Sequence, residues 1–125
     1  MEATFGLNNS FGRFVDLNDG SADNQHRFGI NTNEGIRLKV ADGGSTQANL
    51  DSSSSNLAGT RAIFAATAEA NNMQVWVDGT SVGTDSSGTM PGSLDTVEVG
   101  STGGSTSLGG VIHKINIFEQ TGFKG

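Results

Sequence analysis

The chain has 125 residues, which is enough for one domain with its own core. It contains no cysteine, so disulfides and thiolate metal sites are excluded. The formal charge of -6 disfavours nucleic-acid binding, and the 7 Lys and Arg residues are scattered along the sequence. No apolar run approaches the length of a membrane span, and the first residues lack the pattern of an export signal. We expect a soluble protein that carries no export signal and binds neither membrane nor nucleic acid.

Alternation of apolar and polar residues predicts short strands along the whole chain. The first is expected over residues 3–7. The second is expected over residues 11–17, with Arg13, Val15 and Leu17 on one face. Four more strands are expected over residues 26–32, 46–50, 94–100 and 111–118.

Residues 35–41 show the clearest alternation in the chain. Their apolar residues fall on one face, and Arg37 and Lys39 fall on the other. This pattern is typical of a strand with one buried face and one wet face.

The stretch from residue 61 to residue 83 contains two turn dipeptides, Asn71-Asn72 and Asp78-Gly79. Asp-Gly is a strong hairpin signal because a type I′ turn requires positive φ at both central residues. Asn-Asn is a weaker signal of the same kind. We therefore predict a meander of three antiparallel strands over residues 61–70, 73–77 and 80–84.

The middle strand of this meander has two distinct faces. Met73, Val75 and Val77 are expected to pack into the core. Gln74, Trp76 and Asp78 are expected to meet water or a partner. No helical periodicity of useful length occurs anywhere in the sequence, so the predicted class is all-β. The connecting loops are expected over residues 18–25, 42–46, 51–59, 85–93 and 101–109.

The order of these segments resembles the concanavalin A-like, laminin G-type jelly-roll domain, in the version found in bacteriophage tail-fibre and head-fibre proteins. The resemblance covers Phe11 to Gln120 and rests mainly on two motifs, Val75-Trp76-Val77-Asp78-Gly79 and Leu108-Gly109-Gly110-Val111-Ile112. It implies a two-sheet antiparallel jelly-roll sandwich that forms a single domain over residues 1–125. Family domains usually have more chain before the position of Phe11. The first strand is therefore expected to be short, or to be completed by a neighbouring subunit.

A candidate calcium site lies between the second and third predicted strands. Asp16, Asp19 and Asp23 supply carboxylates of the kind that Ca²⁺ prefers. The spacing does not fit an EF-hand loop, and a tight turn requires the same residue types. The turn interpretation is favoured, with calcium as the alternative. No other cofactor is expected.

A candidate ligand site lies on the wet face of the central meander. Trp76 can stack on a sugar ring, and Asn72 and Asp78 can bond to hydroxyl groups. The favoured alternative is that a neighbouring loop or a second subunit covers Trp76, because tryptophan is enriched at interfaces.

Catalysis is not expected. His26 and His113 are far apart in sequence, and each is expected at a strand edge or on a solvated face. Asp95 and Glu98 should point to opposite faces of one strand, whereas glycoside hydrolysis requires two carboxylates facing one bond. The motif Glu-x-Asp-x-x-Glu of glycosidases that share the fold is absent.

The leading hypothesis is a non-enzymatic bacteriophage virion module, either a head decoration or a fibre or tail component. The resemblance implies other virion proteins as partners, location in the virion, and a symmetric homo-oligomer with a trimer as the expected form. The alternative is a lectin-like module that recognises host surface glycans. The sequence does not separate a head from a tail location.

Overall fold

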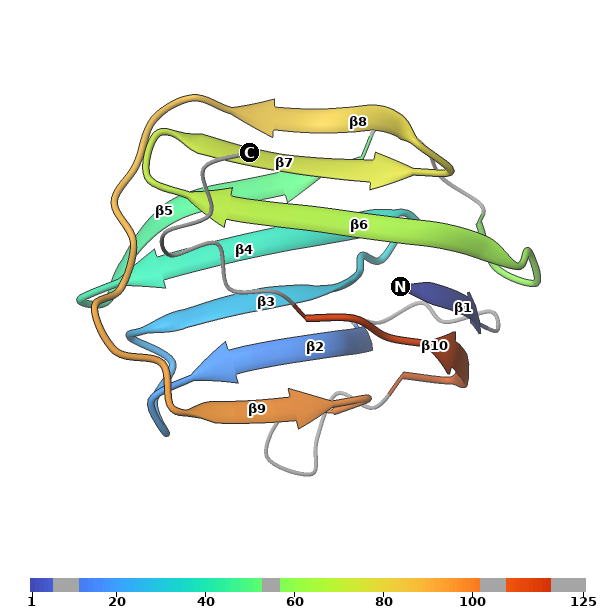
Figure 1. Ribbon diagram of the computed structural model, residues 1–125, viewed down its shortest axis with the longest axis horizontal. Coiled ribbons are helices and arrows are strands. Elements are labelled where there is room, and N and C mark those ends of the chain that lie inside the picture. Colours follow the sequence, from blue (N-terminus) through green and yellow to red (C-terminus); the bar gives the residue numbers. More distant parts are fainter. Residues whose placement is uncertain (6–11, 53–56, 102–107, 118–125) are drawn as a thin grey trace.

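The computed structural model describes residues 1–5, 12–52, 57–101 and 108–117, which form two antiparallel sheets (Figure 1). One sheet has the strand order β10-β1-β6-β7-β8, and the other has the order β5-β4-β3-β2-β9. The strands are β1 (Glu2–Phe5), β2 (Gly12–Asn18), β3 (Gln25–Ile30), β4 (Ile36–Asp42), β5 (Ser45–Asp51), β6 (Ala62–Glu69), β7 (Asn72–Val77), β8 (Thr80–Asp85), β9 (Thr96–Val99) and β10 (Gly110–Lys114).

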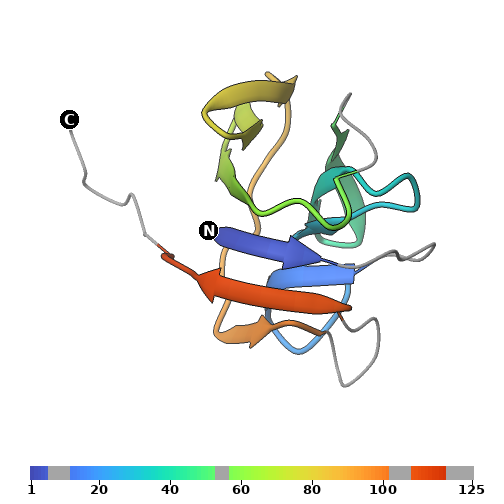
Figure 2. The same ribbon diagram turned by 90° about the vertical axis from the view of Figure 1, so that its right-hand side faces the viewer.

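The two sheets lie face to face as the layers of a sandwich. Figure 2 shows the β6–β8 part of one sheet facing the β4–β5 part of the other. This arrangement confirms the predicted all-β class and the two-sheet antiparallel sandwich. No helix among the described residues is long and apolar enough to cross a membrane.

The central meander is formed by β6, β7 and β8, and one of its two turns differs from the prediction. Asp78 and Gly79 have φ values of 48° and 80°, as a type I′ turn requires. The other turn falls at Ala70 and Asn71, one residue earlier than predicted, because Asn72 pairs with Glu69 in the ladder. Only Asn71, with a φ of 58°, adopts the left-handed conformation there.

The core lies between the sheets and is centred on Phe14. Its ring stacks on Phe64 of the opposite sheet, with centroids 5.3 Å apart, and meets Phe28 edge-on at 5.5 Å. Met73 and Val75 are fully buried in the same cluster, as predicted for that face of β7.

A β-bulge at Phe14 corrects the predicted faces of β2. The ladder with β3 runs from Arg13 opposite Gly29 to Val15 opposite Phe28, so Phe14 is an extra residue on its strand. Phe14 and Val15 therefore both face the core, and Arg13 does not share a face with Val15. A period-two reading cannot register a bulge, because it assumes that every residue is paired.

The strand ends differ from the prediction by a few residues. β1 ends at Phe5, and the predicted residues 6 and 7 lie outside the described residues. β9 is shorter than the predicted range 94–100. β10 ends at Lys114, and residue 118 of its predicted range also lies outside the described residues.

β1 pairs with β6 over a short distance only. The paired residues are Glu2 with Ile63 and Ala3 with Ala62. One more residue pair, Met1 with Phe64, continues this pairing. The Met1 ammonium donates to the Phe64 carbonyl at 2.8 Å, and the Phe64 N–H donates to the Met1 carbonyl at 2.7 Å. The first strand is therefore short, as expected, while its completion by a neighbour stays a prediction.

Candidate functional site

The predicted ligand residues lie on the outward face of β7. Met73 and Val75 belong to the core, so the alternate residues Asn72, Gln74, Trp76 and Asp78 point away from it. We call these four residues the outer strip of β7. Trp76 is partly exposed and is not among the residues packed against the core.

The outer strip is elongated rather than convergent. Asn72 and Asp78 are six residues apart, about 20 Å at the rise of an extended strand. Gln74 Nε2 donates to Asn72 Oδ1 at 2.9 Å, and the Ile63 N–H donates to Asp78 Oδ1 at 2.8 Å. Asp78 thus extends the pairing of β7 with β6 by one residue. Trp76 lies between Asn72 and Asp78 on the strip. The strip suits a chain-like ligand that runs along the strand.

Polar side chains flank the ring of Trp76 on the neighbouring strand. Ser81 is opposite Trp76, and Thr84 is opposite Gln74, both on β8. A partly exposed indole beside hydroxyl and amide groups can stack on the apolar face of a sugar and bond to its hydroxyls.

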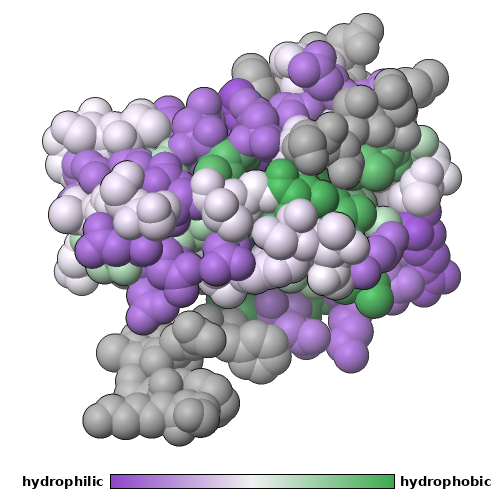
Figure 3. All heavy atoms as spheres, turned by 90° about the horizontal axis from the view of Figure 1, so that it is seen from above, coloured by the Kyte–Doolittle hydropathy of each residue, from purple (hydrophilic) through white to green (hydrophobic). Residues whose placement is uncertain are grey.

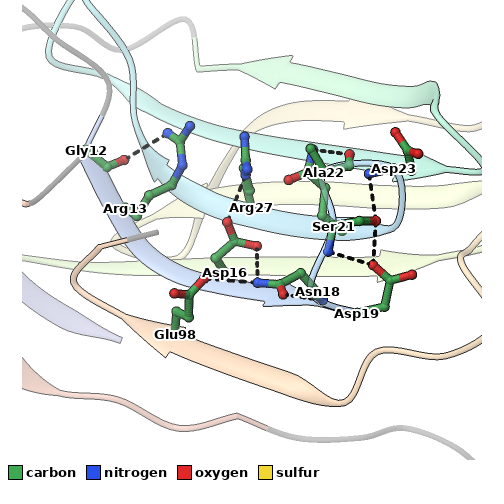
Figure 4. A network of polar contacts seen from close by, with 12 residues as sticks. Gly12, Arg13, Asp16, Asn18, Asp19, Ser21, Ala22, Asp23, Arg27 and Glu98 are labelled. Atoms are coloured by element: carbon green, nitrogen blue, oxygen red, sulfur yellow. Dashed lines mark hydrogen bonds and ion pairs between the residues drawn. The ribbon is translucent and has the colours of Figure 1, made fainter. Parts of the chain in front are cut away.

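The three predicted calcium ligands do not gather around one point. Asp16 is fully buried and accepts a hydrogen bond from Arg27 Nε at 2.8 Å. Asp19 accepts from the Ser21 hydroxyl at 2.6 Å and from Asn24 Nδ2 at 2.8 Å, and these bonds lower the pKa of its carboxyl. Asp23 is exposed at the far end of the turn (Figure 4).

These contacts are those of a turn. Gly20, with a φ of 86°, adopts the left-handed conformation that the turn requires. Among the described residues, no group of three or more His, Asp or Glu side chains is arranged to hold a metal ion. The calcium hypothesis stays a prediction, and the geometry around Asp19 favours the turn.

Sequence reasoning missed two carboxylates that are opposite each other on neighbouring strands and share a hydrogen-bond donor. Asp16 of β2 is opposite Glu98 of β9, and Asn18 Nδ2 reaches both side chains, at 3.4 Å and 3.1 Å (Figure 4). Asp16 and Glu98 are 82 positions apart in sequence, so no local pattern predicts that they are neighbours. Glycoside hydrolysis requires two carboxylates that reach the substrate. Asp16 is 0 % exposed and ion-paired with Arg27, so it does not fit that role.

The outward face of the β2–β5 sheet gathers cations that are scattered in the sequence. The register places Arg13 next to Gly29 and Arg37 in one row, and Arg27 next to Lys39 in the adjacent row. We call Arg13, Arg27, Arg37 and Lys39 the basic face. Strand pairing that spans the three strands brings them together, and the sequence alone does not show it.

The sandwich is open next to the N-terminal end of β1. In Figure 1, β10 overlaps the right-hand ends of β2 and β3 and β1 lies to their right, whereas β6 spans the full width. A pocket of about 430 Å³ opens there, lined by Leu17, His26 and Phe28 from one sheet and by Ala66 and Ala68 from the other. We call this region, together with Val97 and Val99 of β9, the open side.

Apolar side chains remain exposed on the open side. Val97 and Val99 are opposite Leu17 and Val15 in the ladder, yet they are 56 % and 51 % exposed. On the side of the molecule shown in Figure 3, by contrast, a few apolar residues lie between polar ones.

At the open side, part of the β6 backbone has no partner in the part of the chain that the structure describes. Alternate residues of β6 direct their N–H and C=O groups toward β1, and Phe64 uses both groups with Met1. Ala66 and Ala68 follow in the same series, but no backbone hydrogen bond joins them on that side to another described residue. Such an unpaired edge is a template for another strand.

His26 lies in the wall of this pocket, which corrects the expected edge or solvated position. Val40 is opposite His26 in the ladder and is fully buried, so the imidazole lies on the inward face of β3. Its Nε2 atom is buried and has no partner among the described residues, and burial lowers the pKa of the ring. His113, by contrast, is exposed, with Nε2 3.2 Å from the Thr4 hydroxyl.

Comparison with known proteins gives one match. The model of the concanavalin A-like lectin/glucanases superfamily matches residues 4–121. No curated protein and no solved structure matches the chain.

The burial of His26 predicts a loss of stability in mild acid. The unfolded chain takes up a proton near pH 6.5, whereas the folded protein resists protonation because the pKa of His26 is lowered. The titration of His26 therefore leaves the free energy of unfolding unchanged above that pH. Below it, the free energy of unfolding falls as the pH drops, by at most about 1.4 kcal/mol per pH unit. Urea denaturation of the wild type between pH 7 and pH 5 should show this fall.

Two variants separate His26 from other acid effects. His26→Leu should lose part of the slope between pH 7 and pH 5, whereas His113→Gln should keep it. Identical slopes in the wild type and in His26→Leu would contradict the assignment.

Proposed function

Because the chain belongs to the concanavalin A-like lectin and glucanase superfamily, we propose that it is a non-catalytic attachment module of a bacteriophage virion. Domains of this superfamily are often carbohydrate-binding or adhesive modules. The match alone is compatible with lectins and with glucanases, so the choice between them rests on the described residues. Asp16 and Glu98 are opposite each other on neighbouring strands, but Asp16 is fully buried in an ion pair with Arg27. The pair therefore favours a non-catalytic role.

The observation that carries the attachment role is the open side. Ala66 and Ala68 present backbone groups that no described residue pairs on that side, and Val97 and Val99 present apolar surface on the facing sheet. One extended strand from a neighbouring subunit, laid along β6 in line with β1, would bond to the backbone groups of Ala66 and Ala68. Its side chains would cover the apolar surface of Val97 and Val99. Strand addition of this kind combines main-chain hydrogen bonds with side-chain pockets.

The proposed partners are other virion proteins, in a head decoration or in a fibre or tail. A neighbour that completes the sandwich makes the domain a part of an assembly, which agrees with the resemblance to fibre proteins. A symmetric homo-oligomer, with a trimer as the expected form, follows from the symmetry of such assemblies.

Carbohydrate recognition is a second candidate function, favoured by the outer strip of β7. Trp76 is partly exposed on a face that points away from both the core and the open side. A glycan bound along the strip would leave the open side available for assembly. The two functions are therefore compatible in one domain.

The attachment role predicts that a charge on the open side blocks assembly. Val97→Glu should raise the dissociation constant of the oligomer at least about tenfold, because the glutamate carboxylate would have to be buried in the contact. The monomer should fold normally, since Val97 is 56 % exposed. Native mass spectrometry over a range of concentrations measures the effect.

Thr96→Glu is the matched control, because Thr96 is an exposed neighbour whose side chain points to the other face of β9. It should assemble like the wild type. A wild-type protein that stays monomeric at every concentration, alone and with purified capsid or tail protein, would sink the proposal.

The carbohydrate role predicts that binding depends on the indole of Trp76. On an array of bacterial surface glycans, Trp76→Ala should lose affinity about tenfold or more because the stacking surface is removed, while Trp76→Phe should retain part of it. Gln74→Ala, on the same strip, should lose less affinity than Trp76→Ala, because it removes one polar contact and keeps the stacking surface. Absence of any bound glycan, or equal affinity in wild type and Trp76→Ala, rules out this candidate.

A further inference from the structure

The basic face concentrates positive charge in an acidic protein. Four of the 7 Lys and Arg residues of a chain with formal charge -6 lie on it, on three adjacent strands. Like charges placed next to one another on a sheet destabilise it. Folding alone therefore does not explain why they are grouped.

Two of the four cations are occupied within the protein. Arg27 is paired with Asp16 at 2.8 Å, and Arg37 binds both carboxylate oxygens of Asp51, at 2.7 Å and 2.6 Å. This bidentate pairing holds the Arg37 guanidinium beside Asp51.

The other two cations have no carboxylate partner among the described residues. Arg13 is half-buried, its Nε lacks a partner, and its Nη1 makes one long hydrogen bond, of 3.4 Å, to the Gly12 carbonyl. Burial, together with the adjacent charge of Arg27, lowers the pKa of Arg13. Lys39 makes no hydrogen bond or ion pair with a described residue and is partly exposed.

Acceptor groups are interleaved with these cations. Asp51 ends the row of Arg13 and Arg37, Asn49 ends the row of Arg27 and Lys39, and the carboxylate of Glu98 lies beyond Asp16. A ligand that offers only negative charge would be repelled by these carboxylates. A ligand that carries both anionic groups and hydroxyl donors can use the cations and the acceptors together.

Nucleic acid does not fit this face. Its dense phosphate charge is opposed by the net charge of the chain, and none of the described residues on this face is aromatic, so bases have nothing to stack on.

We propose that the basic face binds an acidic polysaccharide that lies across the strands, with carboxylates of different uronic acid residues held by Arg13 and by Lys39 and hydroxyl groups bonded to Asn49 and Asp51. This surface is on the opposite sheet from Trp76, so the proposal is independent of the carbohydrate candidate above. It is also separate from the open side, which lies between the sheets.

The test is calorimetric titration of the whole chain with a hexamer of galacturonic acid, beside a neutral glucose hexamer. The acidic hexamer should bind, the neutral one should bind at least about tenfold more weakly, and binding should weaken between 50 mM and 200 mM salt because exposed charges are screened. The double variant R13Q/K39Q should lose at least about tenfold in affinity through the loss of two charge-assisted hydrogen bonds.

The matched control is R61Q/K114Q, which removes the same amount of charge from the other sheet. It should bind within about twofold of the wild type, since it leaves every proposed contact in place. Trp76→Ala should also leave binding of the acidic hexamer unchanged. The thermal midpoint of R13Q/K39Q should equal or exceed that of the wild type, because neighbouring like charges are removed. Should R13Q/K39Q not fold, Lys39→Gln alone serves, since Lys39 makes no hydrogen bond or ion pair with a described residue.

Four outcomes would overturn the proposal. They are no binding of the acidic hexamer, equal binding of the neutral hexamer, equal losses in R13Q/K39Q and R61Q/K114Q, and tighter binding of poly-glutamate or single-stranded DNA than of the hexamer. The last outcome would assign the face to acidic protein segments or to nucleic acid.

Discussion

The structure depends on the packing of two apolar sheet faces against each other, with Phe14 stacked on Phe64 at the centre. Each sheet buries one face only, so each part of one inner face needs a counterpart on the other. Around Phe14, Phe64 and Met73 that requirement is met, and all three side chains are fully buried. Next to the N-terminal end of β1 the described residues do not meet it, and Val97 and Val99 stay exposed although they share a face with the buried Val15.

The incomplete covering of the inner faces at the open side connects packing with the proposed attachment role. The Ala66 and Ala68 backbone, the pocket beside His26 and the exposed valines of β9 lie close together, where no described strand pairs with β6 beyond Phe64. A partner strand would supply hydrogen bonds and apolar cover at once. The two outward faces take no part in that contact, so they remain available for ligands. One presents Trp76 among the polar groups of the outer strip, and the other presents the basic face.

The sequence predicted what local rules control. The Asp78-Gly79 turn, the two faces of β7 and the alternation of β4 follow from backbone conformation and side-chain period, and the structure confirms them. The fold class and the superfamily are confirmed as well. The virion role stays a prediction, because the superfamily match carries no information about where the domain acts.

What the sequence did not predict arises from long-range pairing. The bulge at Phe14 reverses the face of Arg13 relative to Val15, and only the register with β3 reveals it. The approach of Asp16 to Glu98 and the grouping of Arg13 with Lys39 depend on strands that are distant in sequence. The burial of His26 likewise follows from its register with Val40, not from its neighbours in the chain.

Amide hydrogen exchange along β6, followed by NMR in the isolated domain, tests the central claim most directly. Ala65 and Thr67 pair with β7, so their amides should exchange slowly, whereas the amides of Ala66 and Ala68 should exchange rapidly and become protected only on assembly. Equal protection of all four amides in the isolated domain would contradict the account, because it would mean that the edge of β6 is already occupied.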